Sequence, residues 1–122
     1  MSYLFSRARN FNGNISSWVP HSCSQFIYTF NGTHAFNQDI SSWDMGSATS
    51  LYGMFHDAEV FNQHIGSWST ENVTSLYTTF RYAAAFNQTL NAWDTGNVTS
   101  MAFMCANEPL CDQDISIWDN VK

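Results

Sequence analysis

Apolar residues recur at one fixed interval along this chain, and the polar residues between them recur at the same interval. A 25-residue period such as this one, held without insertions, is the signature of a solenoid built from stacked coils. Each coil can bury its apolar side only against its neighbours, so about three coils are the minimum for a stable core. We therefore predict one solenoid array over residues 1–122, of about five coils, with repeats that start at residues 11, 36, 61, 86 and 111.

Each repeat contains two predicted elements, and the third repeat shows both. From Val73 to Ala83 the apolar residues are spaced by three or four, as on one face of a helix. This helix would be short and rich in Thr, so packing against its neighbours must stabilise it. The segment from Gln63 to Trp68 is too short and too rich in Ser and Gly for a helix, and it is typical of an extended segment. We therefore predict an α/β fold in which stacked extended segments form a narrow parallel sheet and a short helix completes each coil.

Three sets of repeated residues are predicted to hold the coils together. The tryptophan column is Trp18, Trp43, Trp68, Trp93 and Trp118; the asparagine column is Asn12, Asn37, Asn62 and Asn87; and Asp44, Asp94 and Asp119 follow a Trp. The indole rings should form part of the core, where each contributes a large apolar area. The amides should form a ladder, each bonding to the adjoining copy. Each Asp should accept a bond from the backbone two residues on.

The charge balance excludes several classes of partner. The net charge is −6, and the four basic residues, Arg7, Arg9, Arg81 and Lys122, form no cluster in the sequence. Nucleic acids and anionic membrane surfaces need such clusters, so we expect neither as a partner. The longest apolar runs are a few residues long, too short to span a bilayer. Residues 1–5 lack the basic start and long apolar stretch of a signal peptide.

Both ends of the sequence fall inside a repeat. Met1 is in register with Phe26, and Lys122 follows shortly after Trp118. Solenoids normally have polar caps on their terminal coils, and neither end has one. We expect either a fragment of a longer array or a short array whose two uncapped ends contact something else.

The three cysteines allow two interpretations. Cys23, Cys105 and Cys111 occupy columns that hold Val, Ala or Phe in the other repeats, which is typical of buried thiols that fill core positions. Cys105 and Cys111 both replace Phe, and this paired replacement is also consistent with a disulfide that closes the last complete turn. Both interpretations stay open.

Residues 36–44 (FNQDISSWD) and 93–101 (WDTGNVTSM) are similar to the BspA-type leucine-rich-repeat surface proteins, and more narrowly to the 25-residue branch found in mycoplasma lipoproteins. The resemblance covers essentially the whole chain. It implies a right-handed leucine-rich-repeat-like solenoid, an extracellular or surface-anchored location, and a role in binding or adhesion. Two departures are the missing Asn-Val-Thr-Ser-Met run in residues 19–25 and the replacement of Phe by Cys105 and Cys111.

No motif in the sequence indicates catalysis or a cofactor. Nucleophile elbows, phosphate loops and zinc-protease motifs are all absent. Four potential metal ligands lie close together in one repeat: His56, Asp57, Glu59 and His64. They could in principle hold a metal, but we interpret them as solvated surface residues. Asp112 and Asp114 are interpreted as surface acids, because a thin solenoid offers no deep pocket. We expect no enzyme activity, no metal and no cofactor.

In some columns the residue differs from repeat to repeat, and these positions carry the features that are specific to this protein. Two such neighbouring columns place Tyr28, Tyr52, Tyr77 and Phe103 on the outer side of the predicted helical layer. Exposed aromatic residues at this density often mark a protein contact, although adjacent rings can also simply shield one another. The predicted partner-binding residues are these four together with Arg81 and Tyr82.

These observations favour a non-enzymatic protein-binding repeat module of the adhesion or scaffold type. The first alternative is a structural subunit or linker buried in a large assembly, which would suit the uncapped ends and the low content of charged residues. A minor alternative is an ice-binding repeat, because Thr49, Thr74 and Thr99 form a regular column. Ser24 breaks that column, and the Thr-x-Thr motif is absent.

Overall fold

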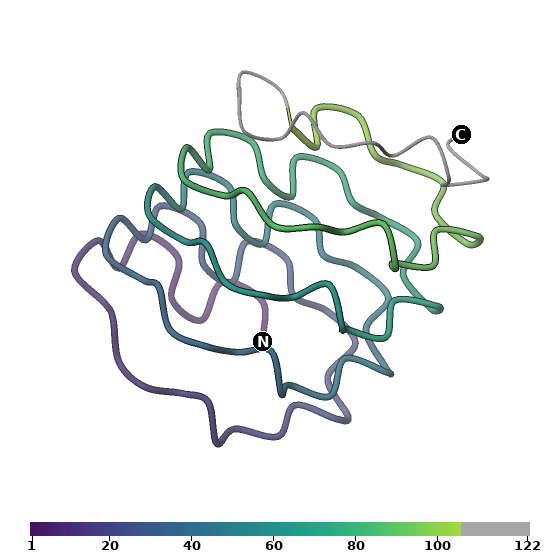
Figure 1. Ribbon diagram of the computed structural model, residues 1–122, viewed down its shortest axis with the longest axis horizontal. Coiled ribbons are helices and arrows are strands. Elements are labelled where there is room, and N and C mark those ends of the chain that lie inside the picture. The colour runs from purple at the N-terminus through teal and green to yellow at the C-terminus, as the bar shows by residue number, and fades with distance from the viewer. Residues whose placement is uncertain (106–122) are drawn as a thin grey trace.

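The computed structural model describes residues 1–105, and these residues form a stack of coils (Figure 1). The coils lie in register from the purple N-terminal coil to the green coils at the other end of the stack. Hydrogen bonds between coils join residues that are 24 to 28 positions apart, so each turn of the stack takes one 25-residue repeat. The predicted repeat fold is confirmed for this part of the chain, and the fifth coil lies outside the described residues.

The predicted helix is wrong: residues 1–105 contain no helix. Where a helix was expected, each coil has a string of tight turns, at residues 2–7, 27–32, 52–57 and 77–82. Two residues per complete string have positive φ angles, for example 59° at Gly53 and 57° at Asp57. A right-handed helix cannot pass through a left-handed residue, so this backbone forms consecutive turns instead.

Backbone hydrogen bonds join each string of turns to the next coil. The N–H groups of Gly53, Phe55 and Asp57 donate to carbonyls of the next coil, at distances of 2.9, 2.9 and 2.8 Å. The N–H groups between them bond within their own turn, as from Met54 to the carbonyl of Leu51 at 3.0 Å. Alternate N–H groups therefore point along the stack, and a string without regular secondary structure still satisfies its polar backbone.

The predicted parallel sheet over Gln63–Trp68 is also wrong for the described residues. Their only ladder contacts are isolated parallel bridges, which link Gln25, Ser50, Ser75 and Ser100 outside that segment. The extended segments are joined by side chains: Asn37 Oδ1 accepts the N–H of Asn62 at 2.9 Å and the amide of Gln63 at 3.0 Å. The same bonds recur one repeat earlier and later. The predicted asparagine ladder is confirmed.

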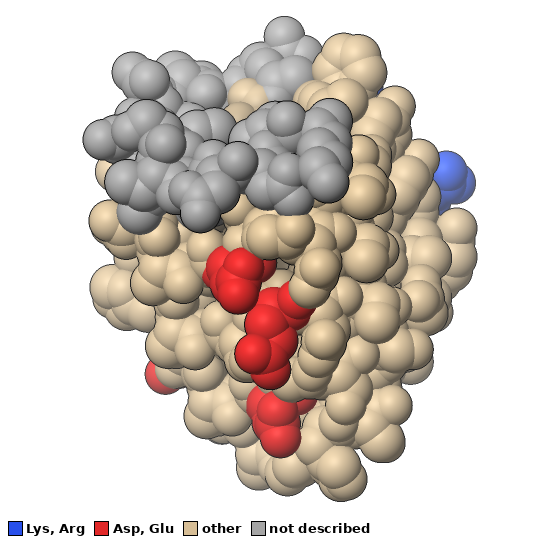
Figure 2. Space-filling view, turned by 90° about the vertical axis from the view of Figure 1, so that its right-hand side faces the viewer, with Lys and Arg blue, Asp and Glu red and all other residues tan. Residues whose placement is uncertain are grey.

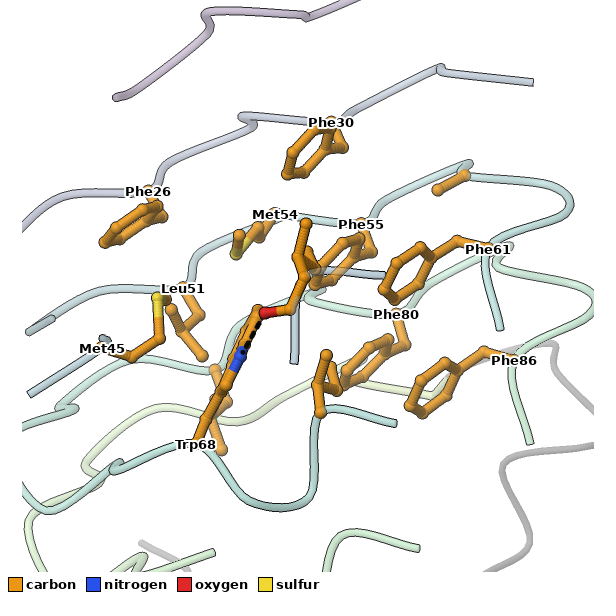
Figure 3. Close-up of a cluster of buried hydrophobic side chains, with 14 of the residues drawn as sticks. Phe26, Phe30, Met45, Leu51, Met54, Phe55, Phe61, Trp68, Phe80 and Phe86 are labelled. Atoms are coloured by element: carbon orange, nitrogen blue, oxygen red, sulfur yellow. Dashed lines mark hydrogen bonds between the residues drawn. The ribbon is translucent and has the colours of Figure 1, made fainter. Parts of the chain in front are cut away.

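The core consists mainly of stacked aromatic rings (Figure 3). Within one coil, the rings of Phe55 and Phe61 stack at 4.1 Å between centroids, and Phe55 stacks on Phe80 of the next coil at 5.6 Å. Trp68 is only 4% exposed, and its Nε1–H donates to the carbonyl of Ile40 at 3.0 Å, the bond dashed in Figure 3. The indole therefore buries apolar area and keeps its polar group satisfied.

The other predicted core features have mixed outcomes. Trp43 and Trp93 are buried like Trp68, but Trp18 in the first coil is 41% exposed. Asp44 and Asp94 each accept the backbone N–H two residues on, as predicted, whereas Asp119 lies outside the described residues. Cys23 is a half-buried free thiol that packs against the core. Cys111 lies outside the described residues, so its pairing with Cys105 stays a prediction.

Candidate interaction surface

One aromatic side chain from each coil lies on the outer side of the turns, and together they form a continuous aromatic strip. Its members in stacking order are Tyr3, Tyr28, Tyr52, Tyr77 and Phe103. Successive ring centroids are 5.7, 5.4, 4.9 and 5.9 Å apart. The structure therefore brings the four predicted column residues side by side and adds Tyr3, which shares the column of Tyr28 in the sequence.

Gly53 allows the strip to pass from Tyr28 to Tyr52. The ring of Tyr28 lies over Gly53, where a Cβ atom would stand 2.5 Å from Tyr28 Cε1. With no side chain in the way, Tyr28 meets Tyr52 edge to face at an interplanar angle of 72°. The positive φ of Gly53 is a second reason for glycine at this position.

His56, Arg81 and Tyr82 form a second row beside the strip. His56 packs edge-on against both Tyr28 and Tyr82, at 6.1 and 5.6 Å between ring centroids. The guanidinium of Arg81 lies 4.9 Å from the ring centre of Tyr82 and 5.1 Å from that of Phe103, within the range of cation–π attraction. Its Nη2 also donates to the Tyr82 hydroxyl at 3.2 Å. The predicted pair Arg81 and Tyr82 therefore adjoins the strip.

These rings are partly open to solvent. Phe103 is 52% exposed and Tyr82 41%, whereas Tyr28, Tyr52 and Tyr77 are half-buried by one another. Partial burial, together with hydrogen bonding to Tyr28, raises the pKa of Tyr52. The surface therefore presents ring edges and hydroxyl groups held in fixed positions, which is favourable for a contact because little side-chain entropy remains to be lost.

The surroundings of His56 favour its neutral form. Burial lowers the pKa of His56, the nearby charge of Asp57 opposes this shift, and Arg81 adds to it. Its Nδ1 lies 3.0 Å from Asn31 Oδ1. Because that oxygen only accepts, Nδ1 must carry the proton.

A groove of about 650 Å³ adjoins the N-terminal part of the strip. Tyr3 and Tyr28 of the strip line it together with Arg7, Arg9 and His34. Sequence analysis missed this feature, because Arg7 and Arg9 are isolated along the chain and acquire their neighbours from the next two coils of the stack. The sequence feature that could have pointed to the groove is that Arg7 and Arg9 each stand in a column whose residue differs between repeats.

Two further candidate features lie within residues 1–105, whereas Asp112 and Asp114 lie outside the described residues. Within residues 1–105, no group of three or more His, Cys, Asp or Glu side chains is arranged to hold a metal ion. The same part of the chain has no helix of the length and apolarity needed to cross a membrane. In the threonine column, the hydroxyls of Thr49, Thr74 and Thr99 donate to carbonyls of the preceding coil at 3.1 to 3.3 Å.

The family model described as "Mycoplasma protein of unknown function, DUF285" matches residues 1–80 and 62–122. The two matches overlap and together span the whole chain, as expected for a tandem repeat. No curated protein and no solved structure matches the chain.

Proposed function

The chain belongs to the DUF285 family of mycoplasma proteins, and we propose that it is a non-enzymatic, protein-binding repeat module of the adhesion or scaffold type. The observation that carries this proposal is the aromatic strip with its adjoining Arg81 and Tyr82. Tyr and Arg are the residue types most often found at interface hot spots. A run of such residues along a rigid stack is a suitable contact surface for a protein.

The backbone hydrogen bonds that join the coils along the strip do not require aromatic side chains, which supports a role of these rings in recognition. At Tyr52 and Tyr77 the coil-to-coil bonds are made by backbone carbonyls, which accept the N–H groups of Tyr28 and Gly53. Any side chain at these positions would leave those bonds in place. Large aromatic residues are therefore not required by the fold, and binding accounts for them better than stability does.

The finer description of fold and location is part of the same proposal. The stacked 25-residue coils and the asparagine ladder support a right-handed leucine-rich-repeat-like solenoid of the BspA type. Surface proteins of that type imply an extracellular or cell-surface location for this chain.

Affinity measurements on a double variant test the proposal. A partner is first isolated by crosslinking from a photoreactive residue placed at Tyr77, and its Kd for the full chain is then measured. Tyr52→Ser with Tyr77→Ser should weaken binding by about 30-fold or more, the factor that corresponds to about 2 kcal/mol for a hot spot.

A matched control lies on the extended segments. His64→Ser with Thr89→Ser changes two exposed residues away from the strip and should leave the Kd unchanged. If the control weakens binding while the strip variant binds normally, the strip is not the contact surface. The extended segments, with Asp39 as a further exposed member, would then be the binding face.

A structural subunit or linker is the second candidate, and one observation favours it. Three apolar residues of the first coil are strongly exposed: Leu4, Trp18 and Val19. Exposed apolar surface of this kind often marks a contact with another protein. Size-exclusion chromatography of the isolated chain separates the two functions, because a binding module should remain monodisperse and a buried linker should aggregate.

A further inference from the structure

We propose that the groove bounded by Arg7 and Arg9 binds a carboxylate side chain from an acidic segment of a partner protein. This inference rests on the proposed protein-binding function and names the chemistry of one part of the partner. The evidence is the position of the two arginines, the polar groups around them, and the charge distribution over the rest of the chain.

The backbone fixes Arg7 against the next coil. Its N–H donates to the carbonyl of Asn31 at 2.6 Å. Gly32 lies directly beneath it, so that a Cβ there would be 3.5 Å from Arg7 Cα and 3.7 Å from Arg7 Cγ. The carbonyl of Arg9 accepts the N–H of His34 at 3.1 Å. Both arginines therefore start from anchored backbone positions on the same wall of the groove.

Neither guanidinium is neutralised by an acid of its own within residues 1–105. The ion pairs there join His34 to Asp57, at 3.2 Å, and His34 to Glu59, at 3.9 Å. No side-chain hydrogen bond of Arg7 or Arg9 occurs in the same part of the chain. Asp57, the one acid that lines the groove, is occupied by His34. The two guanidinium groups are therefore available to an external anion.

The polar groups of the groove floor are already bonded to one another. Asn31 donates to Ser6 Oγ at 3.3 Å and accepts from His56 Nδ1 at 3.0 Å. These bonds make the floor rigid and leave the arginines as the groups with free donors. An arginine fork matches the geometry of a carboxylate and can bind it through two parallel hydrogen bonds.

The charge distribution also favours an anion at this groove. Apart from its two histidines, the lining carries the positive charges of Arg7 and Arg9 and the negative charge of Asp57, in a protein of net charge −6. Elsewhere acidic side chains gather in a column on one side of the stack, with no cation within it (Figure 2). An acidic segment would be repelled from that column and attracted to the groove.

The aromatic strip supplies a second set of contacts for the bound segment. Tyr3 and Tyr28 belong to both the strip and the groove. A bound segment could place its carboxylate between the arginines and an apolar side chain on these rings. The groove volume of about 650 Å³ accommodates one or two residues of such a segment.

The test is an NMR titration of the full chain with two matched peptides, acetyl-Tyr-Glu-Tyr-Glu-amide and acetyl-Tyr-Gln-Tyr-Gln-amide, at low ionic strength. The acidic peptide should shift the amide signals of residues 6–9 and 31–34 and bind at least tenfold more tightly than the neutral peptide. Arg7→Gln with Arg9→Gln should remove this difference, and Arg7→Lys with Arg9→Lys should retain most of it because the charges remain. Added salt should weaken the acidic peptide alone.

Several outcomes would overturn the inference. Equal binding of the two peptides, or an unchanged preference in the Gln variant, excludes carboxylate recognition at the groove. Inorganic phosphate is a third probe, and shifts as large as those of the acidic peptide at the same concentration would mean that the groove binds small oxyanions and not an acidic segment. Tyr52→Ser with Tyr77→Ser lies outside the groove lining, so this variant separates the two proposals. Unchanged partner binding in the variant contradicts the proposed function, whereas equal binding of the two peptides contradicts this inference, and neither result implies the other.

Discussion

The two sides of each coil are held to their neighbours by different parts of the chain. On the ladder side, formed by residues 61–68 and their equivalents, side chains make the bonds between coils, as Asn62, Gln63 and Trp68 do. On the turn side, formed by residues 77–82 and their equivalents, backbone groups make them, as from Phe55 N–H to the carbonyl of Thr79. The ladder side therefore depends on particular side chains. The turn side is joined mainly through its backbone, with some side-chain bonds added, such as Asn31 to Ser6 Oγ and Thr79 Oγ1 to the carbonyl of Leu51.

This difference explains where the repeats vary. The ladder side carries the same Phe-Asn and Trp in each of the first four repeats, because the Asn and Trp side chains bond to a neighbouring coil and the Phe rings stack on one. On the turn side, one column contains Arg7, Gly32, Asp57 and Tyr82, four unrelated residues in the same left-handed conformation. Backbone stacking thus leaves the turn side free to acquire a binding surface.

The largest effect should come from removing a ladder-side ring. Trp68→Ala should lower the free energy of unfolding by about 3–5 kcal/mol, because it leaves a cavity between two coils and removes one of the two hydrogen bonds that the Ile40 carbonyl accepts. Trp18→Ala is the matched control in the same column, and its 41% exposure predicts a loss of about 1–2 kcal/mol. Urea denaturation checks both. Equal losses would show that the column does not depend on burial between coils.

The asparagine ladder gives the next largest effect. Asn62→Ala should cost about 2 kcal/mol, because Asn87 N–H loses its acceptor and the Gln88 amide keeps only the backbone carbonyl of residue 62. Asn62→Asp keeps that oxygen and should retain most of the stability; the sequence itself has Asp112 in this column. Urea denaturation of both variants measures these two losses of stability. If Asp proves as harmful as Ala, the acceptor is not what holds the ladder.

A smaller effect is expected at the glycines of the turn side. Gly53→Ala should destabilise the chain by about 1–2 kcal/mol, because it combines a positive φ with a Cβ placed 2.5 Å from the Tyr28 ring. Gly32→Ala has a similar φ but a first contact at 3.5 Å, so it should cost about 1 kcal/mol from the backbone alone. Thermal melts of the two variants measure the difference. Identical melting temperatures would remove the steric role of Tyr28.

The weakest effect concerns the protonation of His56. Its pKa is lowered in the folded chain, mainly by burial, so the unfolded chain binds more protons below about pH 6.5. Stability should therefore be fully present above that pH and decline as the pH falls through it, by at most about 1.4 kcal/mol per pH unit. Denaturation at several pH values should show this decline in the wild type and not in His56→Gln. The same slope in both chains would assign it to another group.

The sequence predicted the side-chain contacts of the ladder side well, because these depend on residue type, although the parallel sheet predicted there is absent from the described residues. The period, the asparagine bonds and the buried positions of Trp43, Trp68 and Trp93 follow from residue types that recur without change. The exposed Trp18 is the exception. It belongs to the same column, but the burial of an indole depends on packing by neighbouring coils and not on its place in the column.

The helix predicted on the turn side is absent for a physical reason. Left-handed residues recur every four positions, as at Gly53 and Asp57, so the string of turns points apolar residues inward at nearly the spacing of a helix. Hydrophobic periodicity cannot separate the two structures. The usable signals were Gly32 and Gly53, which occupy two of the left-handed positions. The groove was missed because its residues meet only through stacking.

The central claim is that backbone bonds between coils hold the turn side. The most direct measurement is the scalar coupling across the hydrogen bond of the Phe55 amide, detected by NMR in uniformly labelled protein. The structure predicts a coupling from the Phe55 nitrogen to the carbonyl carbon of Thr79 in the next coil. A coupling to the carbonyl of Leu51 instead would indicate an ordinary helix, and would contradict the account.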